Sequence, residues 1–399
     1  MNHNPSALFA VSAGLAGLLV AAGCAPMARP VAPAADRGVL VLRLGPDTMF
    51  IERFELNPGR IHVESVIRTP RVIFRTLDAT LNRDGSFASI RVASTDPANP
   101  RGGEVRDSTT ITFSADSTFY AFGLGRQKQF LRLAGRGDLV ISMPGSYWFP
   151  NYILLAARAP RAPGDSMVGT FTSRLGAYPV VVKRQARDTV TVASQLAGSV
   201  RLILGADGRT VAYDGTGSSL GYLGTRTEWI DIDSVSRAFA ARERASGAVG
   251  VLSVRDTVRA IVGGARITVD YGRPSRRGRT IFGNVVPWNQ VWRTGANLAT
   301  HFSTDRALDF SGSVLPAGTY TLYTIPAPEG WTLLVSGETG QWGSAALDPG
   351  RVVARIPMRV GRSEDVVEKF TIALVERGSG GALRLAWDGT VAEATFAVR

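Results

Sequence analysis

The sequence is poor in cysteine and histidine: it has one cysteine, Cys24, and three histidines in 399 residues. A single cysteine cannot form a disulfide within the chain, so the fold depends on its apolar core. A zinc site needs three or four converging nitrogen, oxygen or sulfur ligands, which this composition does not favour. No Walker or Rossmann glycine pattern is present either. We therefore expect no disulfide scaffold, no metal and no other cofactor.

Lysine is also scarce, because only three of the 45 basic residues are lysines and the rest are arginines. The formal net charge is +12 and the sequence pI is about 10.5. Nucleic-acid-binding proteins usually gather their basic residues on one face or stripe, whereas these arginines are scattered along the chain. We interpret the excess as a compositional bias and expect no nucleic-acid partner. Attraction to an anionic surface, such as lipid headgroups, stays compatible with this charge.

Long apolar runs are absent except at the N-terminus, where residues 8–20 read LFAVSAGLAGLLV. Together with the following Ala-Ala-Gly this makes about 16 apolar or small residues, which are too few for a comfortable membrane-spanning helix. The run ends in Ala-Ala-Gly before Cys24, which resembles a bacterial lipobox, although Ala21 stands where leucine is usual and the leader has no lysine or arginine. An ordinary secretory signal, cleaved near Ala25, is the alternative. We predict a signal peptide over 1–23, export, and a lipid anchor at Cys24 that attaches the protein to the cell envelope, facing the periplasm or the cell surface.

Extended helical periodicity is missing from most of the chain, and short β-branched or alternating runs separated by turn residues take its place. A Pro/Ala-rich tether over 24–37 leads into an antiparallel β domain over 38–230, expected to be a curved sheet, a barrel or a half-barrel. A second β region over 249–399 has the length and strand spacing of a β-sandwich. The predicted fold class is therefore all-β, with two β domains.

One short helix is predicted between the two β regions, in a connector over 231–248. Asp233 is the expected N-cap, and Val235 and Phe239 lie four residues apart on one helical face. Gly247 suits the exit from the helix.

Several motifs in the C-terminal region, about 267–398, occur in the order found in a bacterial family of unknown function, domain-of-unknown-function family 2911. The chain resembles this family at Tyr271-Gly-Arg-Pro-Ser275, Gly278-Arg-Thr-Ile-Phe-Gly283, Val286-Pro-Trp288, Val291-Trp-Arg-Thr-Gly-Ala-Asn297, Leu315-Pro-Ala-Gly-Thr-Tyr320, Gln341-Trp-Gly343 and Leu385-Ala-Trp387. The resemblance implies a secreted or lipid-anchored protein without an agreed activity. Leu298 replaces the glutamate of the family's common pattern Gly-Ala-Asn-Glu-Ala-Thr, so a role that needs that carboxylate is in doubt here.

The stretch WRTGANLATHF, residues 292–302, places polar side chains between two aromatic rings. Guanidinium groups bind carboxylates, phosphates and sugar hydroxyls in bidentate fashion, and tryptophan stacks on apolar ring faces. The alternative is structural, with Arg293 and Asn297 bonding loop carbonyls at a corner of the sandwich. We predict a ligand-binding surface that comprises Arg273, Arg279, Trp292, Arg293, Asn297 and His301.

Two other functions stay open from the sequence. A hydrolase would use His301, or Ser219 in the pattern Gly-x-Ser-x-Gly, but no helix is expected after that serine. A carrier of lipids or other apolar ligands would use the first β domain, where residues 146–152 contain four aromatics. We favour a non-enzymatic binding or accessory role in the cell envelope, with a small anionic or sugar-like ligand or an envelope component as partner. The oligomeric state does not follow from the sequence.

Overall fold

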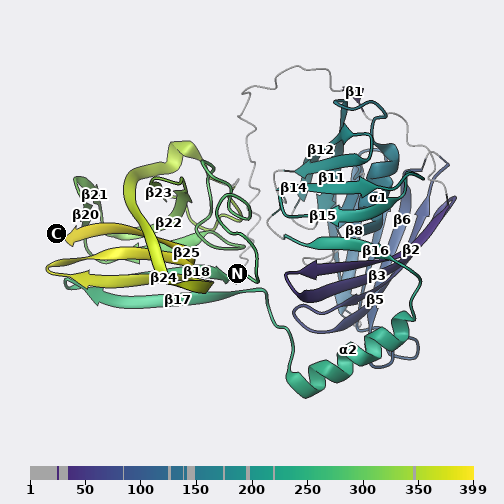
Figure 1. Ribbon diagram of the computed structural model, residues 1–399, viewed down its shortest axis with the longest axis horizontal. Coiled ribbons are helices and arrows are strands. Elements are labelled where there is room, and N and C mark those ends of the chain that lie inside the picture. The colour runs from purple at the N-terminus through teal and green to yellow at the C-terminus, as the bar shows by residue number, and fades with distance from the viewer. Residues whose placement is uncertain are drawn as a thin grey trace, which may run out of the picture.

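The computed structural model describes residues 25–26 and 35–399, apart from residues 84, 125–126, 138, 142–148, 174–175, 195–197, 219–220 and 345–346. Within these residues the chain is all-β, as predicted, and its strands form two sheets accompanied by two α-helices. Figure 1 shows the two sheets as separate bodies, with helix α2 in the connection between them. Cys24 and the predicted signal peptide lie outside the described residues.

The first sheet is a nearly closed antiparallel sheet of 16 described strands. Its strands are β1 (Ala25–Pro26), β2 (Asp36–Leu44), β3 (Asp47–Asn57), β4 (Arg60–Ile67), β5 (Ile73–Leu81), β6 (Phe87–Thr95), β7 (Asp107–Phe113), β8 (Ser117–Leu124), β9 (Gln127–Ala134), β10 (Leu139–Ile141), β11 (Ser166–Ser173), β12 (Gly176–Ala186), β13 (Thr189–Ser194), β14 (Gly198–Leu204), β15 (Thr210–Asp214) and β16 (Leu223–Thr227). Neighbouring strands are antiparallel except that β1 and β10 each run parallel to β11. The antiparallel pairing of β16 with β2 joins the end of the sheet's sequence to its beginning.

The core of the first sheet lies on its inner face and is filled by apolar side chains from alternate strand positions. In β13, for example, Val190 and Val192 are buried, while Thr189 and Thr191, which alternate with them, are half-buried. A helix that the sequence analysis did not predict, α1 (Phe149–Arg158), contributes to this core. Its residues 153–156 are four consecutive buried apolar residues. A helix that is apolar on several sides lacks the one-sided periodicity by which surface helices are predicted.

The second sheet has nine described strands and forms the predicted β-sandwich. Its strands are β17 (Ser253–Val262), β18 (Ala265–Pro274), β19 (Thr300–Thr304), β20 (Leu308–Phe310), β21 (Ser313–Leu315), β22 (Gly318–Ile325), β23 (Trp331–Ser336), β24 (Val352–Arg377) and β25 (Gly380–Val398), with a short 3₁₀ helix η1 (Pro349–Arg351) before β24. Strand β24 is 26 residues long, pairing first with β23 and then with β25. It therefore carries the sheet around an aromatic core that contains Trp292, Trp331 and Trp387.

Helix α2 (Ile232–Ser246) packs against the first sheet and is more than a connector. Ile232 joins Val66 and Phe74 in a small apolar cluster separate from the main core. The N-cap is Asp231, whose carboxylate accepts hydrogen bonds from the backbone N–H groups of residues 233 and 234 at 3.1 and 3.2 Å. The predicted cap, Asp233, was therefore wrong by two residues, because it lies in the first turn.

The two sheets touch where Gly45, between β2 and β3, meets the loop after β18. Gly45 has a φ of +61°, and a Cβ atom there would lie 2.1 Å from the carbonyl oxygen of Arg277. Arg277 also forms an ion pair with Asp47 at 2.9 Å. Only glycine allows this approach without strain.

In the described part of the chain, no helix combines the length and the apolar character needed to cross a membrane.

Candidate functional site

The sequence 292–302 begins as a single bridge to β22 and ends in β19. The backbone N–H of Trp292 donates to the carbonyl of Thr324 at 2.7 Å, and the N–H of Thr324 donates back at 2.8 Å. The Trp292 side chain is 7% exposed and packs between other aromatic rings of the core. Its indole N–H donates to the carbonyl of Gly295 at 3.1 Å. Trp292 therefore anchors the stretch in the core and does not present its ring to solvent.

The turn after Trp292 is compact because its backbone lies against β18. A Cβ atom on Gly272 would be 2.0 Å from the carbonyl oxygen of Ala296. Thr294 and Asn297 have left-handed φ values of 53° and 64°. Asparagine tolerates this conformation, but a β-branched threonine rarely adopts it. The carbonyl of Thr294 accepts a 2.6 Å hydrogen bond from the hydroxyl of Thr300, which fixes the turn.

Residues 337–344, which we call the cover loop, run along the outer side of this turn. The N–H of Ala299 donates to the carbonyl of Gln341 at 2.9 Å, and that of Gly343 donates to the carbonyl of Asn297 at 3.1 Å. The N–H of Arg293 donates to the hydroxyl of Ser344 at 3.1 Å. The structure thus brings Arg293 and Asn297 together beside one loop, as part of the predicted binding surface.

Arg293 differs from Arg273 and Arg279 because its guanidinium forms no hydrogen bond or ion pair with any described residue. The residue as a whole is half-buried, but its Nε atom is buried and has no hydrogen-bond partner within the described structure. Burial lowers the pKa of Arg293 below its ordinary value of 12.5. A guanidinium that is partly removed from water without a carboxylate partner is a ready-made site for an anion.

His301 also contacts the cover loop, from β19. Its Nε2 atom accepts a hydrogen bond from the backbone N–H of Gly340 at 3.1 Å. Burial, with the nearby Arg255 cation, lowers the pKa of His301 below 6.5, and the opposing effect of Asp270 is smaller. The neutral imidazole therefore holds the cover loop through its lone pair, which leaves that nitrogen occupied for any role as a general base.

The other two predicted arginines have partners of their own. Arg273 donates to Asp256 at 3.2 Å, to the carbonyl of Phe370 at 3.2 Å and to the hydroxyl of Thr371 at 3.1 Å. Arg279 donates to the carbonyls of residues 275 and 276 at 2.7 and 3.0 Å, and it lies against Gly221 of the first sheet. Arg273 thus joins β18 to β24, and Arg279 holds the turn after β18 and lies against the first sheet. These partners are outside the cover loop.

Tyr323 of β22 is a residue of this site that the sequence analysis missed. It is fully buried, in a small apolar cluster with Ala299 and Leu334, and its hydroxyl has no partner among the described residues. Burial, with Glu338 nearby, raises the pKa of Tyr323 to about 12, so the phenol is protonated at neutral pH. Nothing in the run Thr319–Ile325 distinguishes it from an ordinary strand tyrosine, so only the tertiary structure reveals it.

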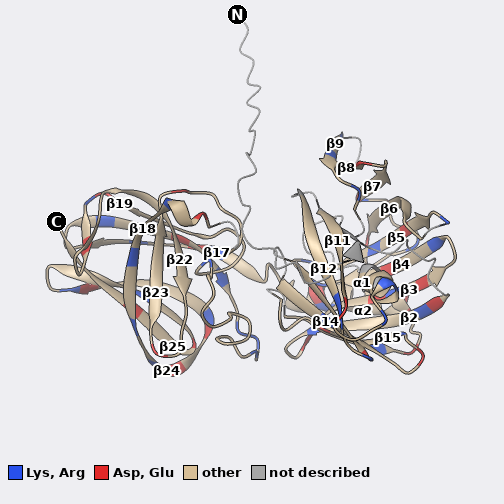
Figure 2. Ribbon diagram, turned by 90° about the horizontal axis from the view of Figure 1, so that it is seen from above, with Lys and Arg blue, Asp and Glu red and all other residues tan. Residues whose placement is uncertain are grey.

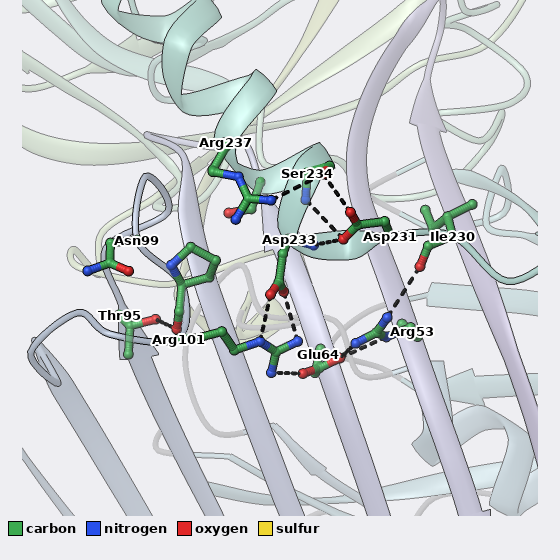
Figure 3. A network of polar contacts seen from close by, with 12 residues as sticks. Arg53, Glu64, Thr95, Asn99, Arg101, Ile230, Asp231, Asp233, Ser234 and Arg237 are labelled. Atoms are coloured by element: carbon green, nitrogen blue, oxygen red, sulfur yellow. Dashed lines mark hydrogen bonds and ion pairs between the residues drawn. The ribbon is translucent and has the colours of Figure 1, made fainter.

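A second polar cluster lies on the outer face of the first sheet, where α2 docks. Figure 3 shows Arg101 between Glu64 of β4 and Asp233 of α2, with Arg53 on the other side of Glu64. Burial alone would raise the pKa of Glu64, but hydrogen bonds from His62, Arg101 and Arg53 outweigh it and hold the pKa at about 2. Each charge in this cluster has a partner, so we interpret it as the attachment of α2 to the sheet.

The other chemical candidates are a metal site, Ser219 and the aromatic run 146–152. No group of three or more His, Cys, Asp or Glu side chains in the described part of the chain is arranged to hold a metal ion. Ser219, the serine of the hydrolase alternative, lies outside the described residues. Of the aromatic run 146–152, the described end belongs to α1, where Tyr152 packs on Tyr213 with ring centroids 5.5 Å apart. Basic and acidic side chains are interspersed over both sheets (Figure 2).

Comparison with known proteins supports the resemblance found in the sequence. Residues 253–396, which include the whole cover loop and Arg293, match the family model described as a protein of unknown function, DUF2911. No curated protein matches the chain. Among solved structures, a double mutant of the vaccine antigen transferrin binding protein B from Haemophilus parasuis Hp5 aligns at 9% sequence identity with a TM-score of 0.11. The alignment covers 87% of this chain and 65% of that one, and its score is too low to assign a fold or a function.

Proposed function

Because the second sheet matches a family of unknown function and presents an arginine that has no counter-ion among the described residues, we propose that this protein binds a small anionic ligand at Arg293. The role is non-enzymatic, and the protein acts in the cell envelope, to which Cys24 anchors it. The site consists of Arg293, Asn297 and His301 with the cover loop. Arg293 carries the proposal, because most buried charges in proteins are paired and this one has no acidic partner in the described residues.

The surroundings of Arg293 support an occupant with negative charge. Arg255, the other arginine beside this turn, is neutralised by Asp270 at 2.9 Å and donates to the carbonyls of residues 298 and 299. Arg293 is therefore the positive charge beside this turn that has no acidic partner within the described part of the chain. Trp342 on the cover loop is 51% exposed, and Asn297 on the adjoining turn is exposed as well, so an aromatic ring and an amide are accessible on these two segments. These groups suit the recognition of an organic anion.

The binding proposal is tested by thermal-shift and calorimetric titration of the purified protein with small anions. Arg293→Gln is expected to abolish the response, because it removes the cation that is proposed to bind the anion. The matched control is Arg266→Gln, since Arg266 is an exposed arginine of the same sandwich that is already paired with Asp305 at 3.1 Å. Equal anion responses in the two variants would refute the proposal.

The envelope assignment is tested separately, in cells. Cys24→Ser is expected to release the protein from the membrane fraction and to remove labelling by a radioactive fatty acid, because the thiol is the proposed site of lipid attachment. A wild-type protein that keeps its leader and stays in the cytosol would contradict export. A wild-type protein that is exported but not labelled would support the ordinary secretory signal.

A further inference from the structure

Building on the proposed anion site, we infer that the ligand is a monocarboxylate with an apolar body, held by Arg293 and by the hydroxyl of Tyr323. The inference rests on the proposed function, because it needs Arg293 to be the anion-binding cation. It adds a second donor and a chemical class of ligand. Two buried polar atoms without partners in the described structure, Nε of Arg293 and the hydroxyl oxygen of Tyr323, carry it.

The strand register places Arg293 and Tyr323 on the same side of the sheet. Trp292 and Thr324 are bonded to each other as an isolated antiparallel bridge pair, so Arg293, which follows Trp292, and Tyr323, which precedes Thr324, lie at the same end of the bridge. Side chains alternate along a strand, and Trp292 points into the sandwich core. Tyr323 accordingly lies in the separate cluster outside that core, and Nη1 of Arg293 lies 3.9 Å from the position of a Cβ on Gly343 in the cover loop.

The guanidinium and the phenol can both donate hydrogen bonds, and neither of the two buried atoms has an acceptor partner among the described residues. The phenol is a donor at neutral pH, since burial and Glu338 raise the pKa of Tyr323. A guanidinium has donors only. An occupant that satisfies them must supply at least two acceptor atoms, which a carboxylate does with its two oxygens. An uncharged alcohol would supply one oxygen and would leave the guanidinium charge uncompensated.

The charge balance selects a single negative charge. Arg293 supplies one positive charge, and the neighbouring Arg255 is already paired with Asp270. Glu338, on the cover loop, affects Tyr323 with a negative charge of its own. A dianion such as phosphate would bring an excess charge into a half-buried site beside that carboxylate.

The neighbouring side chains determine the rest of the ligand. Tyr323 packs with Ala299 and Leu334, and residues Val291, Ile325, Leu347 and Val352 pack against this cluster. An apolar body attached to the carboxylate would extend the same cluster and remain out of water. We therefore expect hexanoate and benzoate to bind more tightly than acetate.

The test uses calorimetric titration of the full-length protein with hexanoate, benzoate, acetate, inorganic phosphate and hexanol. Hexanoate or benzoate should bind, and hexanol should not. Tyr323→Phe should weaken carboxylate binding about 10-fold or more, the value of one hydrogen bond to a charged group. Arg293→Lys should weaken it more than 10-fold, because an ammonium cannot reproduce the bidentate fork. Arg266→Gln should bind like the wild type.

Each other outcome overturns a defined part of the inference. Phosphate binding that depends on Arg293, without carboxylate binding, would refute the monocarboxylate class and leave the anion site standing. Carboxylate binding that is unchanged in Tyr323→Phe would remove Tyr323 from the site. If no anion binds, or if Arg293→Gln binds as the wild type does, the inference and the proposed function fail together.

Discussion

Replacing Tyr323 with phenylalanine should stabilise the unliganded protein, which is the opposite of the usual effect of losing a buried hydroxyl. A buried polar group without a partner carries a desolvation cost of about 1–3 kcal/mol. The Tyr323 side chain is 0% exposed, and its hydroxyl has no hydrogen bond to any described residue. Removing that oxygen leaves a small void, which reduces the gain. We expect a net increase in the free energy of unfolding of about 1 kcal/mol, or a rise in Tm of roughly 4 °C.

Tyr271→Phe is the matched control, because Tyr271 is an equally buried tyrosine of the same sheet. Its side chain is 1% exposed, and its hydroxyl accepts a hydrogen bond from the backbone N–H of Ile372 at 3.2 Å. The same chemical change here leaves a buried N–H without a partner, so the free energy of unfolding should fall by about 1–3 kcal/mol. The two variants therefore differ only in whether the hydroxyl is bonded, and their effects should have opposite signs.

Denaturant unfolding followed by tryptophan fluorescence measures both variants in the intact chain. Five of the seven tryptophans lie between residues 288 and 387, so the signal reports mainly on the second sheet. A loss of stability in Tyr323→Phe as large as that in Tyr271→Phe would show that the Tyr323 hydroxyl is bonded in solution. The reasoning that assigns it to a ligand would then be refuted.

Three further predictions concern charges. By NMR titration, His62 should have a pKa above 6.5, because of its hydrogen bonds first to Glu64 and then to Asp78, and His301 should have one below 6.5. The contribution of His62 to the free energy of unfolding is present below pH 6.5 and is lost as the pH rises through the folded-state pKa of His62. The contribution of His301 is present above pH 6.5 and is lost as the pH falls through the folded-state pKa of His301. Hydrogen exchange at the Gly340 amide should therefore accelerate relative to the Gly343 amide on acidification below pH 6.5; equal protection would contradict the His301 contact. In chemical unfolding, Glu64→Gln should lower the free energy of unfolding by about 3 kcal/mol, because it leaves Arg53 and Arg101 without their shared carboxylate. The control Asp116→Asn, which removes one partner of an exposed 3.9 Å ion pair, should change it little. Equal effects of the two variants would show that the Glu64 cluster does not hold α2 in place.

The fold class followed from the sequence because strand signals are local. Alternating residues such as those of β13 and turn residues between strands predict antiparallel sheets without knowledge of tertiary contacts. The DUF2911 resemblance was confirmed for the same reason, since its motifs are written in consecutive residues. Helix α1 was missed because Ile153–Ala156 are all buried, so the residues show no contrast between an apolar and a polar face. The end of α2 was predicted at Gly247, whereas its cap was placed two residues late because Asp231 and Asp233 both suit an N-cap.

The candidate site was only partly accessible from the sequence, because charge balance depends on tertiary contacts. Arg273 and Arg293 have the same side chain, but Asp256 comes into reach of Arg273 through the pairing of β17 with β18. Trp292 was predicted to contact a ligand because tryptophan often does so, and the structure places it in the core. Tyr323 became visible only through its register with Arg293 across the bridge between residues 292 and 324.

The position of the proposed site explains why a rigid sandwich suits a binding role. Residue 292 is anchored in an aromatic core on one side of the sheet, and residue 293 carries the uncompensated charge on the other. The core therefore sets the direction of the guanidinium without contacting the ligand, and the cover loop, held by His301 and the carbonyl of Asn297, sets its exposure. Loss of stability from two unpaired buried donors is the expected cost of keeping a site ready for an acceptor. The stability gain predicted for Tyr323→Phe and the affinity loss predicted for the same variant are thus two consequences of one missing hydrogen bond.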